Sequence, residues 1–234
     1  MRATSKLLAL AFTAALQPAM AGTVALNFED VTAAGALGPG QNGLQAGSRY
    51  AGQGVSFTGD AWSVKSKIGS CGETQGLLFT TQSPGGGCGA LLLAGAAGGQ
   101  PTGDVKKFTI DVADGFLTGS SFLYGIRSVA DVTIEVFSEA AGQGRSLFFT
   151  DSFSAGECTN SALLFCNGFW GTQKLEFSGT AKSLVIMGLD QSFMMDNLNF
   201  FTPTASNQLP EPTSIALALG ALAGAGWTRR RAAR

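Results

Sequence analysis

Two pairs of oxygen-bearing side chains, one near each end of the polar part of the chain, have the chemistry needed to bind a metal ion. Glu29 and Asp30 occur in the segment NFED, and Asp196 and Asn197 occur in the segment MMDN. Calcium takes six to eight oxygen ligands from carboxylates, amides and backbone carbonyls. If the first and last strands of the body lie side by side, these four residues form a candidate structural calcium site. The alternative is that they are solvated turn carboxylates and a strand cap.

Aromatic side chains form the second group with recognisable chemistry, because sugar rings stack their apolar faces on flat aromatic rings. Trp62, which follows Asp60 closely, and Trp170 are the main candidates for a ligand platform, and Tyr50 and Tyr124 are further ones. Indole and phenol rings combine a large apolar area with a polar group. Most tryptophans in a β-sandwich belong to the core, so a structural role is the alternative for each.

Catalytic motifs are missing from the sequence. The chain contains no histidine, which excludes every catalytic scheme that uses imidazole. It also lacks a G-x-S-x-G elbow, a Walker loop and an H-E-x-x-H pair. We therefore predict a protein without catalytic activity. The alternative is a secreted glycan-active enzyme that uses two of its carboxylates as a pair.

Four cysteines indicate disulfide bonds. Cys71, Cys88, Cys158 and Cys166 are an even set, and an exported chain meets an oxidising compartment. Zinc is disfavoured because the sequence has neither a C-x-x-C motif nor a histidine. Of the three pairings that four cysteines allow, we favour Cys71–Cys88 and Cys158–Cys166, because each pair brackets a loop rich in Gly, Ser or Asn.

The region from 22 to 203 predicts an all-β body. The segment VTIEVF alternates, with Val132, Ile134 and Val136 on one face of a strand and Thr133, Glu135 and Phe137 on the other. About a dozen such runs separated by glycine-rich breaks predict a two-sheet β-sandwich of the jelly-roll type. The expected strands are 24–28, 54–58, 61–66, 77–80, 90–94, 106–112, 120–124, 131–137, 146–153, 173–177, 183–187 and 195–201.

The N-terminal segment 1–21 predicts a secretory signal peptide. Arg2 and Lys6 precede a short apolar run, and Ala19-Met20-Ala21 forms an Ala-x-Ala site with cleavage between Ala21 and Gly22. The remaining body, residues 22–209, carries nine Lys or Arg and fifteen Asp or Glu, a net charge of −6. An acidic, exported body excludes nucleic acid and anionic membrane surfaces as expected partners.

The C-terminal segment predicts a short membrane anchor. After a linker at 204–209 come Pro210-Glu211-Pro212, thirteen apolar residues from Ile215 to Trp227, and a basic end. A helix of that length is roughly 20 Å long, which is short for a bilayer core of about 30 Å. The basic tail favours the cytoplasmic side and would stop transfer of the chain. The arginines in this tail are Arg229, Arg230, Arg231 and Arg234.

The order of tripeptide, apolar helix and basic end at 210–234 resembles the PEP-CTERM sorting signal of Gram-negative bacteria. The sortase signal L-P-x-T-G is a poorer match, because Pro212 stands where threonine is required. GPI signals normally lack a basic end. The resemblance implies that exosortase is a partner, that the chain is held briefly in the inner membrane, and that it then reaches the cell surface or extracellular matrix.

Together these features predict an exported protein with a non-catalytic structural or polysaccharide-associating role. The resemblance to the PEP-CTERM family implies that this role is in an exopolysaccharide or biofilm matrix. No cofactor other than calcium is indicated by a motif.

Overall fold

The computed structural model describes residues 22–31, 43–65, 87–96, 101–126, 132–153 and 170–203. The predicted signal peptide, linker and sorting signal, including the arginine tail, lie outside these residues. No helix within the described ranges is long and apolar enough to span a bilayer, and the expected anchor at 215–227 is not among them.

Twelve strands and three short 3-10 turns make up the described body. The turns are η1 (Glu29–Val31), η2 (Ala51–Gln53) and η5 (Ala140–Gly142). The strands are β1 (Gly22–Leu26), β2 (Gly43–Gln45), β3 (Val55–Gly59), β4 (Ala61–Lys65), β5 (Gly89–Leu93), β6 (Val105–Phe116), β7 (Ser121–Ile126), β8 (Thr133–Glu139), β9 (Gln143–Thr150), β10 (Gly171–Lys174), β11 (Ala181–Leu189) and β12 (Phe193–Thr202).

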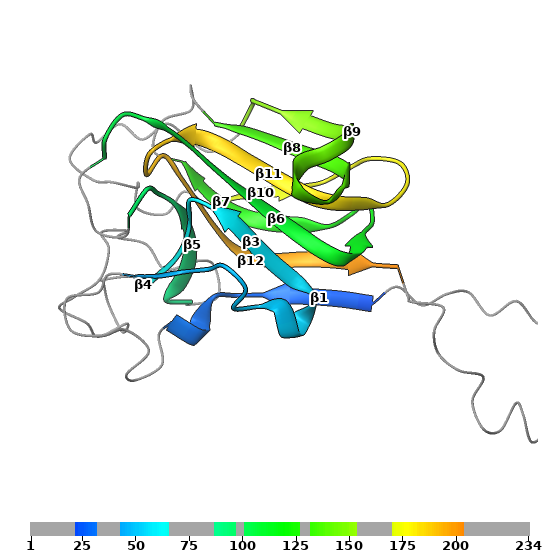
Figure 1. Cartoon of the computed structure of the whole chain (residues 1–234), viewed down its shortest axis with the longest axis horizontal. Coiled ribbons are helices and arrows are strands. Elements are labelled where there is room, and N and C mark those ends of the chain that lie inside the picture. The colour runs from blue at the N-terminus through cyan, green and yellow to red at the C-terminus, as the bar shows by residue number, and fades with distance from the viewer. Residues whose placement is uncertain are drawn as a thin grey trace, which may run out of the picture.

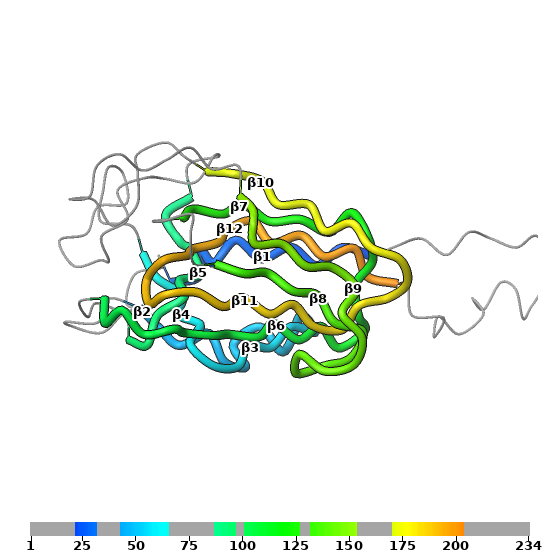
Figure 2. Tube along the Cα trace, turned by 90° about the horizontal axis from the view of Figure 1, so that it is seen from above, coloured from blue at the N-terminus to red at the C-terminus, as the bar shows by residue number. Residues whose placement is uncertain are grey.

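These strands form two antiparallel sheets that pack face to face as a β-sandwich (Figure 1). The larger sheet, sheet A, has the order β10-β7-β12-β5-β4-β2, and β1 also pairs with β12. The smaller sheet, sheet B, has the order β3-β6-β11-β8-β9. Seen face-on, the strands of both sheets run in nearly the same direction (Figure 2). The prediction of an all-β body built from two sheets is therefore confirmed.

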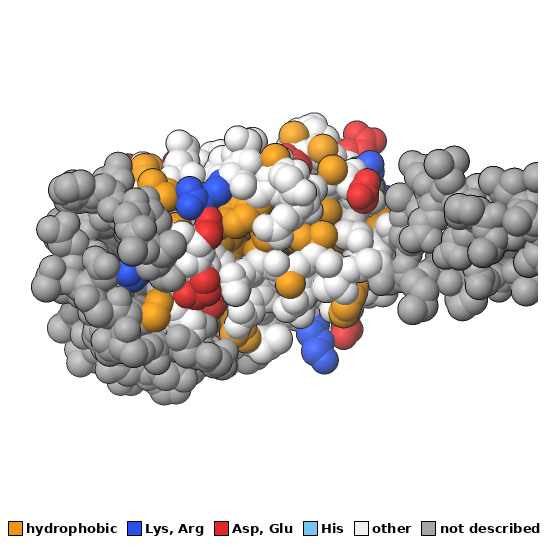
Figure 3. All heavy atoms as spheres, turned by 90° about the horizontal axis from the view of Figure 1, so that it is seen from below, with side chains coloured by type: hydrophobic (Ala, Val, Ile, Leu, Met, Phe, Trp, Pro, Cys, Tyr) orange, Lys and Arg blue, Asp and Glu red, His pale blue; other side chains and the backbone are white. Residues whose placement is uncertain are grey.

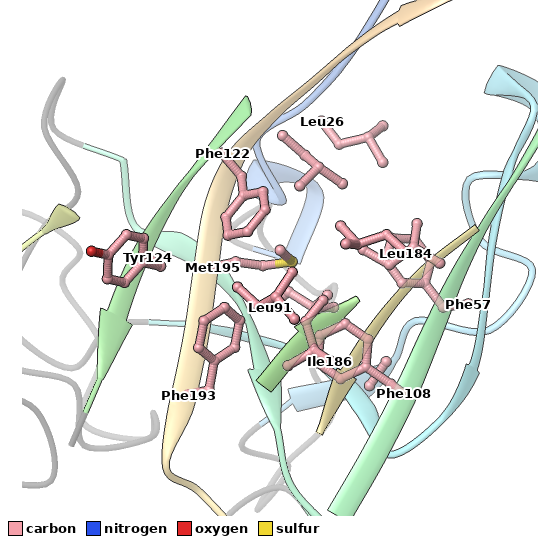
Figure 4. Packing of buried hydrophobic residues seen from close by; sticks show 14 of the residues in the cluster. Leu26, Phe57, Leu91, Phe108, Phe122, Tyr124, Leu184, Ile186, Phe193 and Met195 are labelled. Atoms are coloured by element: carbon pink, nitrogen blue, oxygen red, sulfur yellow. The ribbon is translucent and has the colours of Figure 1, made fainter. Parts of the chain in front are cut away.

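The core fills the space between the two sheets. Sheet A contributes Leu91 and Phe193, sheet B contributes Phe108 and Ile186, and these side chains point toward one another (Figure 4). In β8, Ile134 is fully buried, whereas the residues on either side of it are half-buried on the outer surface, as the alternation predicts. Each such buried side chain contributes about 1.5–3 kcal/mol of hydrophobic stabilisation.

The predicted strands differ from the observed ones mainly at their ends. Strand β6 extends to Phe116 and β9 begins at Gln143, so both are longer or shifted relative to the expected 106–112 and 146–153. Strand β2 was missed, because three residues are too few to show an alternation. The strand expected at 77–80 lies outside the described residues.

The first and last strands lie side by side, as the calcium hypothesis assumed. Gly22 is opposite Thr202 and Leu26 is opposite Leu198. Immediately after β1 the chain turns at Phe28, which has a φ of 55° and a fully buried ring. The carbonyl oxygen of Phe28 would lie 2.1 Å from a Cβ added to Gly89. Glycine at position 89 therefore lets the backbone after β1 approach β5 closely.

We expect Gly89→Ala to lower the free energy of unfolding by about 1–3 kcal/mol, because the new methyl group forces the backbone of Phe28 away from β5. Gly52→Ala is the matched control, since a Cβ there meets no atom within 4 Å. The control should stay within about 0.5 kcal/mol of wild type. Urea unfolding followed by circular dichroism measures both, and equal stability of the two variants would contradict the close approach.

Candidate functional site

The two tryptophans proposed as ligand platforms lie on the same outer face of sheet A. Trp62, in β4, and Trp170, which directly precedes β10, both pack against one buried apolar cluster that is separate from the main core. Both indoles are half-buried, so part of each ring remains accessible to solvent. The cluster consists of Val64, Ala90, Leu92, Ala94 and Met194. We call this cluster and the two indoles the tryptophan face.

Strand register explains how residues far apart in the sequence share this face. Trp62 is opposite Leu92, Leu92 is opposite Met194, and Met194 is opposite Gly125. Trp170 precedes Gly171, which is opposite Tyr124 in β7. The tryptophans thus stand at opposite ends of a row that crosses β4, β5, β12, β7 and β10. Four steps at the ~4.8 Å strand spacing separate their backbones by about 19 Å.

Met194 forms the middle of this row because its neighbour is a glycine. A Cβ added to Gly125 would lie 2.7 Å from the Cε of Met194, so the thioether side chain extends over the backbone of β7. Viewed from the side of β1, the molecule has hydrophobic side chains scattered over its described surface, and its charged side chains lie mainly toward the two ends (Figure 3). The five cluster residues are only 0–2% exposed, so within the tryptophan face it is the two indoles that are open to solvent.

Two buried polar atoms on or beside the tryptophan face lack hydrogen-bond partners. They are the indole Nε1 of Trp170 and the hydroxyl oxygen of Ser192, which lies two residues before Met194. A buried donor that makes no hydrogen bond costs about 1–3 kcal/mol. Both atoms are buried, so a ligand at the surface could not reach them without movement of the chain, and the half-buried indole rings are what mark this face as a candidate binding surface.

The turn that carries Ser192 is held rigidly by the neighbouring Asp190. The Asp190 carboxylate accepts hydrogen bonds from the backbone N–H of Gly95 at 3.0 Å and of Thr102 at 3.0 Å, and from the Thr102 hydroxyl at 3.2 Å. This buried carboxylate ties the β11–β12 turn to both ends of the β5–β6 connection. These contacts could not be predicted from the sequence, because the partners of Asp190 lie almost a hundred residues before it.

Tyr50 and Tyr124, the two further candidates for sugar stacking, are core residues, which corrects that expectation. Their exposed fractions are 6% and 3%. Tyr50 packs edge-on against Phe28 with ring centroids 5.6 Å apart, and Tyr124 packs against Phe153 at 5.4 Å. Each ring is thus enclosed by other aromatic side chains and has no face left for a ligand.

The four candidate calcium ligands come from two elements. Glu29 and Asp30 lie in η1, where the Glu29 carboxylate accepts the Gly89 N–H at 2.8 Å and Asp30 pairs with Arg49. Asp196 lies in β12, and its Oδ1 accepts the N–H of Asn197 at 2.7 Å. Within the described ranges, no three His, Cys, Asp or Glu side chains are grouped so as to hold a metal ion. Calcium binding by these residues stays a prediction.

Cys88 is the predicted disulfide cysteine that falls within the described residues, and it is disulfide-bonded. Cys71, Cys158 and Cys166 lie outside them. The pairing of the four cysteines stays a prediction.

Several other carboxylates hold turns and strand ends in place. Asp60 accepts the N–H of Lys107 at 3.2 Å, and Asp111 accepts the N–H of Ala141 at 2.6 Å. These contacts give both carboxylates a structural role, whereas sequence reasoning singled out neither.

No family model and no curated protein matches the chain. Among solved structures, the K1 cleaved adhesin domain of Lys-gingipain from Porphyromonas gingivalis W83 is 10% identical with a TM-score of 0.45, covering 77% of this chain and 98% of that one. TmCBM61, solved with β-1,4-galactotriose, is 13% identical with a TM-score of 0.32 over 63% and 88% of the two chains. A mutant of CBM29-2, a family 29 carbohydrate-binding module, is 14% identical with a TM-score of 0.29 over 68% and 99%.

Tyr50 gives the fold a specific sensitivity to alkaline pH. Its hydroxyl donates to Asp30 at 2.7 Å, and burial raises the pKa of the phenol above its ordinary value of 10.0. Above about pH 10 the unfolded state loses the phenol proton while the folded state keeps it. The contribution of the protonated Tyr50 to the free energy of unfolding is therefore complete below about pH 10 and declines as the pH rises further. The decline is at most about 1.4 kcal/mol per pH unit.

We expect the stability difference between wild type and Tyr50→Phe to be constant at neutral pH and to shrink above about pH 10. Denaturant unfolding at a series of pH values, with tyrosinate absorbance followed in parallel, tests this. A difference that stays constant through the alkaline range would show that the Tyr50 phenol titrates normally in the folded protein.

Proposed function

We propose that this protein is an exported, non-catalytic component of an extracellular matrix that associates with polysaccharide through the tryptophan face. The observation that carries the proposal is the convergence of Trp62 and Trp170 on one outer face of sheet A. Two half-buried indoles whose backbones are about 19 Å apart can each contact a different ring of one sugar chain.

The charge of the body indicates which polymers fit. Residues 22–209 carry a net charge of −6, so a polyanion would be repelled, whereas a neutral polysaccharide would not. We therefore propose a polymer without acidic groups as the ligand.

We further propose that the sandwich is of the jelly-roll type. Strands β5 to β12 supply the support: β5-β12-β7-β10 are neighbours in sheet A, and β6-β11-β8-β9 are neighbours in sheet B. Along the chain these strands alternate between the two sheets, with β8 and β9 as the exception. Eight strands in two four-stranded sheets is the arrangement expected of a jelly roll.

Delivery of the protein is proposed from the chain ends. The signal peptide at 1–21 would direct export, and the apolar segment after Pro212 would hold the chain in the inner membrane. Exosortase would then act near Pro210-Glu211-Pro212 and release the body to the cell surface or matrix.

The sorting proposal predicts that the mature protein from its native host begins at Gly22 and lacks residues 213–234. Intact-mass measurement with terminal peptide mapping of surface protein tests both ends. Recovery of Arg234 from mature surface protein would show that the tail is retained and would argue against exosortase processing.

The binding proposal predicts that Trp62→Ala and Trp170→Ala each weaken retention by the producing organism's exopolysaccharide about fivefold or more. The loss corresponds to about 1 kcal/mol for one aromatic contact. Co-sedimentation in calcium and in EDTA measures retention, and melting curves check that the variants fold. Phe149→Ala is the matched control, because Phe149 is 55% exposed on the other sheet.

If both tryptophan variants fold and are retained by the polysaccharide as well as the wild-type protein is, then this face does not bind the polysaccharide. Equal loss in Phe149→Ala would indicate nonspecific adsorption. Measuring the length of the polymer after incubation distinguishes binding from the alternative, an enzymatic function. A carboxylate-dependent hydrolase shortens the polymer, whereas a binding protein leaves it intact.

A further inference from the structure

A concave site lies on sheet B, between the two 3-10 turns η2 and η5. It is a cleft of about 240 Å³ between η2 and β3 on one side and η5 on the other. Its base is formed by the paired strands β3 and β6, in which Ser56 is directly opposite Asp111. A cavity of this size is below the ~300–1,000 Å³ of pockets for drug-sized ligands, so it suits a single small ring.

The lining combines the chemistry that a sugar ring requires. Asp111 supplies hydrogen-bond acceptors, Lys182 supplies donors, and the Ser56 hydroxyl can act in either way. Methyl groups provide apolar contact around these polar groups, from Ala51, Ala113 and Ala140. One negative and one positive side chain balance each other, so the lining favours a neutral ligand over an ion.

Both charged groups have hydrogen-bonding capacity left for a ligand. Asp111 uses its Oδ1 to accept the N–H of Ala141, and a carboxylate can accept several further hydrogen bonds. The ammonium group of Lys182 donates to the carbonyl oxygen of Ala113 at 3.4 Å and has three N–H groups in all. Lys182 is exposed, so its ammonium group is reachable from solvent.

The wall of the cleft is held in an unusual backbone conformation. Ala141 in η5 has a φ of 58°, in the left-handed region that non-glycine residues rarely adopt. Two side chains of the sheet fix it there: Asp111 binds the N–H of Ala141, and the Ser183 hydroxyl accepts the N–H of Gly142 at 3.0 Å. The same carboxylate that lines the cleft therefore also positions its wall, as expected of a preorganised binding site.

We propose that this cleft binds one neutral hexopyranose ring, as a terminal or branch unit of the polymer. This inference rests on the proposed function for its choice of ligand class. Asp111 accepts from two ring hydroxyls, Lys182 donates to a third oxygen, and the alanine methyl groups contact the apolar face. The cleft and the tryptophan face lie on different sheets, so one molecule can engage two parts of a glycan.

The test titrates the full chain, with its disulfides oxidised, with the methyl glycosides of glucose, galactose, mannose and N-acetylglucosamine. Amide chemical shifts of Ala113, Ala140 and Ala141 report on the cleft, and the indole N–H signals report on the tryptophan face. We expect at least one glycoside to shift the cleft amides in a saturable manner. Asp111→Asn and Lys182→Met should each weaken that binding about tenfold or more, the effect of losing one charge-assisted hydrogen bond.

The variants are chosen to separate binding from folding. Asp111→Asn keeps an oxygen that can accept the N–H of Ala141, and Lys182→Met changes an exposed side chain, so both should fold. Lys107→Met is the matched control, because Lys107 is also exposed on sheet B but does not line the cleft. It should bind the glycoside as wild type does.

The proposal is overturned if no glycoside shifts the cleft amides, or if both variants bind as tightly as wild type. If the protein shows either of these results but is still retained by the polymer, the proposed function stands and only the assignment of this cleft is wrong. Conversely, glycoside binding in the cleft by a protein that does not retain the polymer supports this site and contradicts the proposed function of the tryptophan face.

Discussion

Strand β12 is the constraint on which the rest of the structure depends. It pairs with β7 along one edge and with both β5 and β1 along the other. Between Asp196 and Asn199 it carries one extra residue, and Asn197 there has a φ of 49°. Side chains alternate between the two faces of a strand, so Met194, Leu198 and Phe200 would all share one face in a regular strand. Because of the bulge, Leu198 and Phe200 lie in the core whereas Met194 faces outward. Without the extra residue, each side chain in the second half of β12 would point to the opposite face of the sheet.

The local features of this fold were readable from the sequence because each depends on a few neighbouring residues. The alternation in VTIEVF correctly assigned Ile134 to the core and Thr133 to the outer surface, since a strand repeats every two residues. The bulge at Asn197 was not predictable, because the MMDN segment gives no sign of a left-handed residue. Tyr50 was placed wrongly, because the aromatic neighbours that bury it come from β3 and from the turn after β1.

The sequence could indicate which types of residue form a binding site, but it could not show how those residues are arranged in space. Trp62 and Trp170 could be selected as polar-tipped aromatic residues, yet their shared face follows from pairing across five strands. The cleft beside Asp111 had no sequence signal, because its wall is a hairpin turn folded back over a different strand. Both sites are made by long-range pairing, which periodicity within one segment does not encode.

The pairing of β1 with β12 makes the fold depend on the order in which the chain becomes available. Gly22 is opposite Thr202, so the first strand can be completed only by the last one. Contacts between such distant residues are costly in chain entropy and slow to form. Because β1 begins at Gly22 and β12 ends at Thr202, sheet A closes only when the whole stretch 22–202 is present. A chain cut before β12 therefore leaves β1 without its partner strand.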